Sequence, residues 1–182
     1  VYIPAGIFLS GALFLKSNMT LYIEKGGVLK GSTDPDDYRP FILNRYSGWE
    51  METYSSLINA GVLNHDDGYN VTNLSIRGEG IIFGGGAELG NAMMEAEGYY
   101  SRGRLICLMN CKNVNIQELT IENSPSWTIH YIYSKNVTLH DLSIVSRSIR
   151  NGDGIDPDSS EDSYIFNCII TTSDDCIAIK SG

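Results

Sequence analysis

The sequence lacks a long apolar run, and no stretch approaches the roughly 18 residues that a bilayer-spanning helix needs. Basic residues are also few, with 13 Lys and Arg against 22 Asp and Glu and a net charge of −9. Because affinity for a phosphate backbone comes from clustered Lys and Arg, we expect neither a membrane span nor a nucleic-acid partner. The opening residues VYIPAG show no signal peptide and are typical of sequence inside a domain.

Cysteine is scarce as well. Four cysteines are too few for a disulfide scaffold, and their spacing matches no standard zinc site. Apolar neighbours, as in LICLMNC and FNCII, favour buried free thiols, with one disulfide as the alternative. The four are Cys107, Cys111, Cys168 and Cys176.

Helical periodicity is almost absent. Residues 89–99 predict a short helix, and STDPDDYRP at 32–40 predicts a loop. Elsewhere short alternating runs rich in Val, Ile, Leu and Thr are interrupted by Gly, Asn, Asp and Ser. This pattern predicts strands and turns, and therefore an all-β fold.

The strand pattern repeats. NVNIQELTIENS, from Asn113, recurs as NVTLHDLSIVS about 23 residues later, and more loosely as DSYIFNCIITTS about 26 residues after that. NVTNLSIRGEG, from Asn70, is an earlier copy of the same repeat. Its residues 74–76 are expected to lie about two repeats before residues 119–121. Helix-free repeats of this size match one coil of a parallel β-helix. We predict one domain over 1–182, with N-terminal coils in 1–90 and central and catalytic coils in 100–182.

Asparagines begin these phrases. Asn70, Asn113 and Asn136 are expected at the same corner, where Asn tolerates a left-handed backbone and can bond its neighbour in the next coil. This corner role explains the N-x-S/T sequences at Asn18, Asn70, Asn73 and Asn136 better than glycosylation.

The most acidic segment is NGDGIDPDSSEDSYIFNCIITTSDDCIAIKSG, residues 151–182. Asp153 and Asp174 lie 21 residues apart, about one coil, so adjacent strands bring them together, and a bend at TTSDD brings in Asp175. Their mutual repulsion should raise at least one carboxyl pKa. Three interpretations fit this spacing: acid–base hydrolysis of a glycosidic bond, turn chemistry, or a calcium site.

The same residues carry a resemblance. NGDGIDPDSS, followed one coil later by SDDCIAIKSG, resembles the paired Asn-Thr-Asp and Asp-Asp motifs of glycoside hydrolase family 28, the polygalacturonases and related pectin hydrolases. VYIPAGIFLSGALFLKSNMTLYIEKGGVLKGS and NSPSWTIH also resemble coils of that family, so the likeness covers nearly the whole chain. It implies a right-handed parallel β-helix and an inverting hydrolase of α-1,4-galacturonosyl bonds, with carboxylates about 6.5–9.5 Å apart.

The resemblance also implies the setting in which such a protein works. The partner would be a pectic polysaccharide or an oligogalacturonide, the chain would act as a monomer, and no cofactor or metal would be needed. Localisation would be secreted or periplasmic.

Motif positions then suggest roles. The resemblance makes Asp174 the general acid, has Asp153 and Asp175 activate a water, and keeps Asn151 beside them. Asp156 and Asp158 are expected to be structural turn residues. Candidate substrate-binding residues are Asn151, Lys180, His130 and Trp127, with a solvated surface lysine as the alternative for Lys180 and core or corner packing as the alternative for Trp127. Arg102, Arg104, Arg147 and Arg150 could also reach the groove, although surface charge is the alternative for the last two.

The chain departs from the family pattern in three places. Gly152 stands where Thr or Asn is usual, and GEGIIFGGG at 78–86 stands where an Asp-Gly pair is common. The family's Gly-His-Gly motif and Arg-x-Lys clamp would lie beyond Gly182, and His65, His130 and His140 do not match that histidine. We therefore expect a fragment truncated at both ends.

Rival functions remain open at this stage. One is a rhamnogalacturonan hydrolase or an exo-acting pectin hydrolase. Another is a calcium-dependent pectate lyase, in which Asp residues hold Ca²⁺ and a basic residue abstracts a proton. A third is a non-catalytic β-helix that binds polysaccharide.

Overall fold

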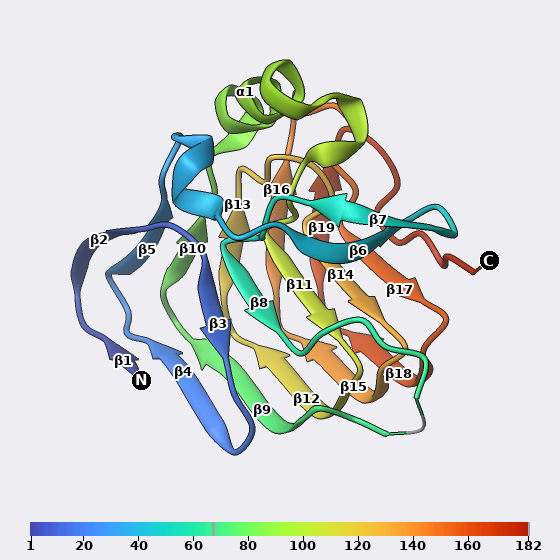
Figure 1. Cartoon of the computed structure of the whole chain (residues 1–182). Helices are drawn as coiled ribbons and strands as arrows, with labels where there is room; N and C mark the ends of the chain where they lie inside the picture. The colour runs from blue at the N-terminus through green and yellow to red at the C-terminus, as the bar shows by residue number, and fades with distance from the viewer. Residues whose placement is uncertain (67, 182) are drawn as a thin grey trace.

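The computed structural model describes residues 1–66 and 68–181. Three parallel sheets extend along these residues, and successive strands of a coil enter successive sheets (Figure 1). The first sheet contains β1 (Tyr2–Ile3), β4 (Met19–Ile23), β9 (Val71–Gly78), β12 (Cys111–Gln117), β15 (Lys135–His140) and β18 (Glu161–Phe166). The second contains β2 (Gly6–Ser10), β5 (Gly27–Gly31), β10 (Ile81–Phe83), β13 (Thr120–Glu122), β16 (Ser143–Ser146) and β19 (Ile169–Thr172). The third contains β3 (Leu13–Leu15), β8 (Ile58–Ala60), β11 (Ile106–Met109), β14 (Ile129–Ile132) and β17 (Ile155–Asp158).

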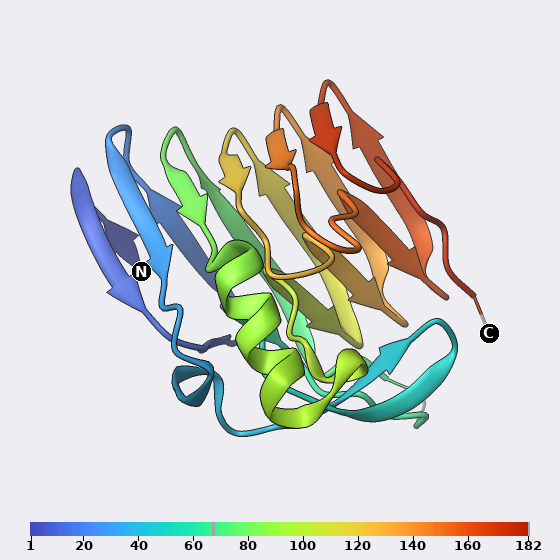
Figure 2. The ribbon, with the colours of Figure 1, turned by 90° about the horizontal axis from the view of Figure 1, so that it is seen from above.

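This arrangement is a parallel β-helix, as the repeats predict. Figure 2 shows the coils side by side in chain order from the N-terminus to the C-terminus. Lys112 pairs with Lys135 and Val137 with Ser163, which confirms the predicted steps of 23 and 26 residues. Alternate residues of each strand point inward, so the Val, Leu and Ile side chains of successive coils form one core.

A ladder of asparagines lines one corner of the stack. Asn18, Asn73, Asn113 and Asn136 have φ between 55° and 58°, and each side-chain amide donates to the preceding side-chain carbonyl at 2.9–3.0 Å. The corner prediction holds for Asn113 and Asn136 but was wrong for Asn70, because Asn73 occupies that place. Asn70 instead bonds the backbone of Val62.

The same register corrects the expected position of residues 74–76. They pair with 114–116 in the next coil rather than lying two steps before 119–121. The intervening coil spans 40 residues, because it carries a helix that a regular repeat does not anticipate.

The helix α1 (Gly86–Glu97) lies along one side of the stack (Figure 2) and is followed by the 3₁₀ turn η2 (Tyr99–Ser101). The predicted helix at 89–99 is confirmed with an earlier start, and the predicted loop at 32–40 contains a second 3₁₀ turn, η1 (Pro35–Tyr38). Within the described residues, no helix is long and apolar enough to cross a membrane.

A hairpin not expected from the repeats interrupts the first coils. It consists of antiparallel β6 (Ile42–Tyr46) and β7 (Trp49–Thr53), joined by Ser47 and Gly48 with φ of 49° and 87°. Two positive φ values are typical of a type I′ turn. The hairpin and adjoining loops contribute to a second apolar cluster outside the third sheet, which contains Leu63, Cys107, Met109 and Ile132, with Ile42 and Tyr133 packed against it.

All four cysteines are free, so the disulfide alternative was wrong. Cys107 and Cys111 are buried as predicted, and burial raises their pKa to about 11 and about 12. Cys168 is half-buried and Cys176 is exposed.

Candidate active site

The acidic residues meet where the third sheet ends. Asp153 lies just before β17, and Asp174 and Asp175 lie in the bend after β19. Gly154 N–H donates to the Asp175 carbonyl at 2.9 Å, and Ile155 forms a parallel bridge with Ile177. One carboxylate oxygen from each of Asp153, Asp174 and Asp175 lies within 4.8 Å of the others, which confirms the predicted convergence. The register places Asp175, rather than Asp174, directly beside Asp153.

Side-chain bonds hold the bend in place. Ser173 Oγ donates to the carbonyl of Ser146 at 3.1 Å, and Thr172 Oγ1 donates to the carbonyl of Asp174 at 2.9 Å. These bonds turn the chain so that neighbouring aspartates both face the cluster instead of pointing to opposite sides of a strand.

The structure explains Gly152, which departs from the family pattern. A Cβ at this position would lie 2.8 Å from Ser173 Oγ and 2.9 Å from the Ser146 carbonyl. The bend after β19 therefore packs against the space that a side chain at Gly152 would fill.

The three carboxylates differ in burial. Asp153 is 4% exposed, whereas Asp174 and Asp175 are exposed. Burial is the main cause that raises the pKa of Asp153; repulsion from Asp174 adds to it, and Lys180 opposes it. The predicted rise of one pKa is thus confirmed, with desolvation rather than repulsion as the principal cause.

Lys180 faces this cluster. Its Nζ lies 2.8 Å from Asp156 Oδ1 and 3.4 Å from Asp153 Oδ2, and 4.1 Å from the centroid of the Trp127 ring. Burial lowers the pKa of Lys180, but the two carboxylates outweigh burial and leave the pKa raised. Burial raises the pKa of Asp156 to about 7, with Lys180 acting in the opposite direction.

The prediction that Asp156 and Asp158 are turn residues was wrong. Both lie on β17, fully buried, and pair in register with His130 and Ile132 of β14. Buried carboxyl groups are possible in this strand because side chains from other segments pair with them: Lys180 with Asp156, and Arg45 and His130 with Asp158.

Asp158 forms the centre of one such network. Arg45 Nη1, on β6, lies 3.3 Å from Asp158 Oδ1 and donates to Tyr133 Oη at 2.8 Å and Ser159 Oγ at 2.9 Å. On the other side, His130 Nε2 lies 3.4 Å from Asp158 Oδ2. Burial favours a higher Asp158 pKa, but His130, Arg45 and Ser159 outweigh it and lower the pKa. The hairpin is therefore pinned to the strand that follows Asp153.

Two predicted substrate-binding residues lie beneath the surface. Trp127 is 3% exposed and stacks on Tyr46 with ring centroids 4.6 Å apart, while Lys180 and Arg104 lie over its ring. His130 is fully buried, and burial lowers its pKa to about 4, so the ring is neutral at ordinary pH. In the described structure both support the site from below, and their contact with substrate stays a prediction.

Asn151 lies at the edge of the site. Its Oδ1 accepts from Tyr99 Oη at 2.7 Å and from Arg102 Nη2 at 2.8 Å. Arg102 is buried and also donates to the carbonyl of Arg150 at 2.7 Å, so it fixes the loop before Asp153 rather than reaching solvent.

Arg104 is likewise buried and donates to the carbonyl of Arg102 at 2.6 Å. Arg147 and Arg150, by contrast, are exposed. Sequence reasoning missed Arg45 and the hairpin, although the Ser-Gly pair between alternating residues was a usable turn signal.

Asp153, Asp174 and Asp175 are also the residues that could hold a cation, since each offers a carboxylate oxygen. The Lys180 ammonium already lies 3.4 Å from Asp153 and supplies positive charge there.

A parallel β-helix that gathers one buried and two exposed carboxylates is compatible with either enzyme class considered above, a glycosidase or a calcium-dependent lyase. The comparison with protein families gives the narrower result: the chain belongs to the glycosyl hydrolases family 28, whose model matches residues 49–182.

The relatives include a "Probable polygalacturonase" of Vitis vinifera, 35% identical, and an "Exo-poly-alpha-D-galacturonosidase" of Dickeya chrysanthemi, 30% identical. The matches cover 100% and 99% of this chain but only 37% and 36% of those proteins. Among solved structures, an exopolygalacturonase from Thermotoga maritima has a TM-score of 0.84 at 30% identity, over 100% of this chain and 46% of that one. A family 28 exopolygalacturonase from Yersinia enterocolitica has a TM-score of 0.86 at 28% identity, over 98% and 38%. The chain thus spans less than half the length of these relatives.

Proposed function

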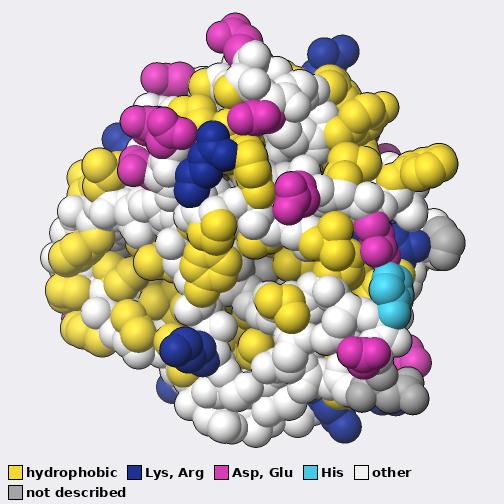
Figure 3. All heavy atoms as spheres, in the orientation of Figure 1, with side chains coloured by type: hydrophobic (Ala, Val, Ile, Leu, Met, Phe, Trp, Pro, Cys, Tyr) yellow, Lys and Arg dark blue, Asp and Glu magenta, His cyan; other side chains and the backbone are white. Residues whose placement is uncertain are grey.

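We propose that this chain forms part of the active site of a polygalacturonase, which hydrolyses α-1,4-galacturonosyl bonds in pectic polysaccharide or oligogalacturonides. The observation that carries the proposal is the convergence of Asp153, Asp174 and Asp175 at the motif positions of the family. The protein would act as a secreted or periplasmic monomer and would need no metal. On the face shown in Figure 3, basic side chains lie singly rather than as a continuous patch.

The proposed roles follow from the motif positions of the family, since Asp174 and Asp175 are both exposed. Asp174 is exposed and can reach the glycosidic oxygen, to which it donates its proton as the C–O bond breaks. Asp153 and Asp175 hold a water and accept its proton as the new bond to the sugar C1 forms. The raised pKa of Asp153 means that this base is ionised only above its shifted pKa, so activity should fall on acidification.

One oxygen from each of the three carboxylates lies within 4.8 Å of the others. The expected range of about 6.5–9.5 Å refers instead to the separation between the acid and base carboxyl groups, so that expectation stays a prediction. Inversion is therefore proposed from family membership and not from spacing.

A second candidate is exo-acting attack. The relatives and solved structures that match along nearly the whole chain include exopolygalacturonases and an exo-poly-galacturonosidase. Under this alternative the same carboxylates act, and only chain-end bonds are cleaved.

Product analysis tests the function. The full-length protein is incubated with polygalacturonate, and the anomeric configuration of the first product is followed by NMR. We expect inversion, and we expect Asp174→Asn to reduce kcat by at least about 10²-fold, because general acid catalysis contributes about that much. Exclusive release of short products from the chain end would support exo attack.

Other outcomes would contradict parts of this proposal. Retention of configuration would contradict single displacement. Unchanged hydrolysis by Asp174→Asn would remove the catalytic assignment. Unsaturated products whose formation stops with a chelator would indicate a calcium-dependent lyase.

A further inference from the structure

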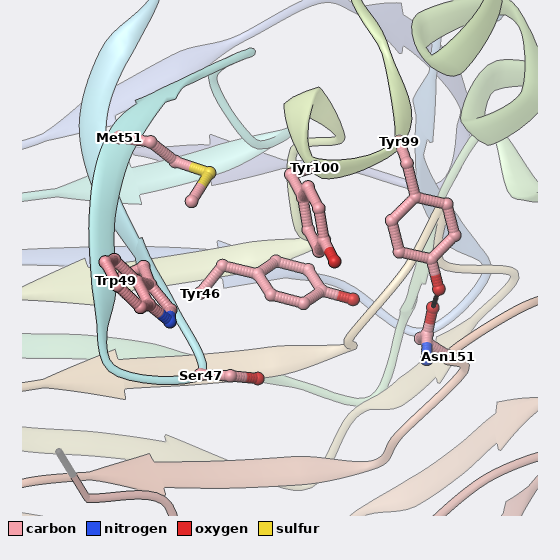
Figure 4. Close-up of a pocket in the computed structure, with 7 residues that line it drawn as sticks. All are labelled: Tyr46, Ser47, Trp49, Met51, Tyr99, Tyr100 and Asn151. Atoms are coloured by element: carbon pink, nitrogen blue, oxygen red, sulfur yellow. Dashed lines mark hydrogen bonds between the residues drawn. The ribbon is translucent and has the colours of Figure 1, made fainter.

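A hollow of about 600 Å³ lies beside Asn151, in the loop that leads to Asp153. Aromatic rings from the hairpin and from η2 form most of its wall, together with the loop that leads to Asp153 (Figure 4). Its size is within the range of small-molecule sites. The lining residues are Tyr46, Ser47, Trp49, Met51, Tyr99, Tyr100 and Asn151.

Two of these rings are available to a ligand. Trp49 is 75% exposed and Tyr100 is 54% exposed, so both rings are open to a ligand. Tyr46 lies between them and is held from behind by stacking on Trp127. Figure 4 shows the Tyr46 and Tyr100 hydroxyls pointing into the same space. The hollow thus offers flat apolar faces beside hydroxyl donors and acceptors, which suits a sugar ring.

Three arginines lie near the rings of the hollow, although the chain carries −9 overall. The Arg102 and Arg150 guanidinium carbons lie 4.9 and 5.0 Å from the Tyr99 ring centroid, and that of Arg104 lies 5.0 Å from the Tyr46 centroid. In the part of the chain that the structure describes, none of these three arginines pairs with a carboxylate; the arginines that do are Arg39 and Arg45. Arg102 and Arg104 are buried, so Arg150 is the exposed member that a ligand carboxylate can meet.

The hollow shares one loop with the proposed catalytic site. Asn151 lines the hollow and stands two positions before Asp153, and the Tyr99 hydroxyl that lines it bonds Asn151 at 2.7 Å. This shared loop is the observation that links the hollow to a polymer held at Asp153 and Asp174.

We propose that this hollow is a subsite for one hexuronate residue, with Trp49 and Tyr100 contacting the sugar faces and Arg150 pairing with its carboxylate. This inference rests on the proposed function for the identity of the polymer. It assigns a binding role to the hairpin β6–β7 and to η2, neither of which carries a catalytic carboxylate.

The experiment measures trigalacturonate binding by calorimetry in full-length protein carrying Asp174→Asn, so that the ligand is not consumed. Trp49→Ala and Tyr100→Ala should each raise Kd about three- to tenfold, the usual contribution of an aromatic contact. Tyr164→Ala is the matched control, since Tyr164 is 55% exposed on β18, outside the hollow, and should leave Kd unchanged.

A second arm tests the charge. Arg150→Gln should weaken binding of trigalacturonate but not of its neutral methyl ester. Unchanged Kd for both aromatic variants, or an equal effect of Arg150→Gln on both ligands, would overturn the subsite. Hydrolytic activity of the Asp174→Asn parent reports separately on the proposed function, so the two failures are distinguishable.

Discussion

At the scale of single residues, Lys180 sets the charge of the site. Its ammonium lies between Asp153 and Asp156, two carboxyl groups whose burial favours the protonated form. By stabilising the ionised carboxylates, Lys180 keeps the proposed base available at lower pH than burial alone would allow.

Replacing this lysine should therefore change the pH profile. Lys180 lowers the pKa of Asp153, so in Lys180→Met that pKa rises further, and ionised Asp153 is lost at a higher pH as the solution is acidified. The acid limb of kcat/KM should move to higher pH, as measured on oligogalacturonides over a pH series. Lys180→Arg keeps the charge and should leave the limb closer to that of the wild type. A limb that stays in place, or moves to lower pH, in Lys180→Met would show that Lys180 does not act on the base.

The convergence of Asp153, Asp174 and Asp175 was predictable from sequence, and the burial of their neighbours was not. One coil of separation was enough to bring Asp153 and Asp174 together, because strand spacing is fixed. The two-residue spacing of Asp156 and Asp158 is compatible with either a turn or a strand, so the sequence alone did not place them on β17. Their burial depends on ion pairs with Lys180 and Arg45, and only the tertiary structure brings these two basic side chains to the aspartates.

At the scale of elements, the asparagine ladder makes two contributions to the stability of the corner, one from the backbone and one from the side chains. Each member takes a left-handed backbone, and each amide joins the next coil. A substitution at Asn113 can separate them, since Ala loses both and Gly loses only the side-chain bonds.

We expect Asn113→Ala to lower the free energy of unfolding by about 2 kcal/mol, and Asn113→Gly by about 1 kcal/mol less than that, because an L-residue in the left-handed region costs about 1–2 kcal/mol. Urea unfolding of the two variants measures the difference. Equal losses would mean that the side-chain bonds, and not the backbone conformation, stabilise the corner.

The regular coils were also the predictable elements. Steps of 23 and 26 residues follow from repeated phrases, whereas the 40- and 55-residue steps contain inserted segments that have no counterpart in other coils. The error at Asn70 arose there, because a fixed period cannot locate the corner on the far side of an insertion.

At the scale of the whole molecule, stability depends on neighbours in the stack. In the described residues β12 pairs with β9 and β15, whereas β18 pairs with β15 alone. In a stack of repeats each outermost coil contacts only one neighbour, whereas an inner coil contacts two. Opening an outer coil therefore costs less free energy than opening an inner one.

Hydrogen exchange of the 182-residue chain should show this gradient. Amides of β12 and β14 are expected to exchange slowest, and those of β2, β18 and β19 first. Peptide-resolved mass spectrometry measures the order. Uniform protection from β2 to β19 would indicate a single cooperative unit instead.

The contacts that join Arg45 to Asp158 of β17 and to Ser159 have a consequence for biosynthesis. Arg45 and its hydrogen-bond partner Ser159 are 114 residues apart, and at a synthesis rate of about 5–20 residues per second the arginine is made roughly 6 to 23 s earlier. During that interval the hairpin lacks the residues that fix it over the third sheet. The contacts of Arg45 with Asp158 and Ser159 can therefore form only after translation has passed β17.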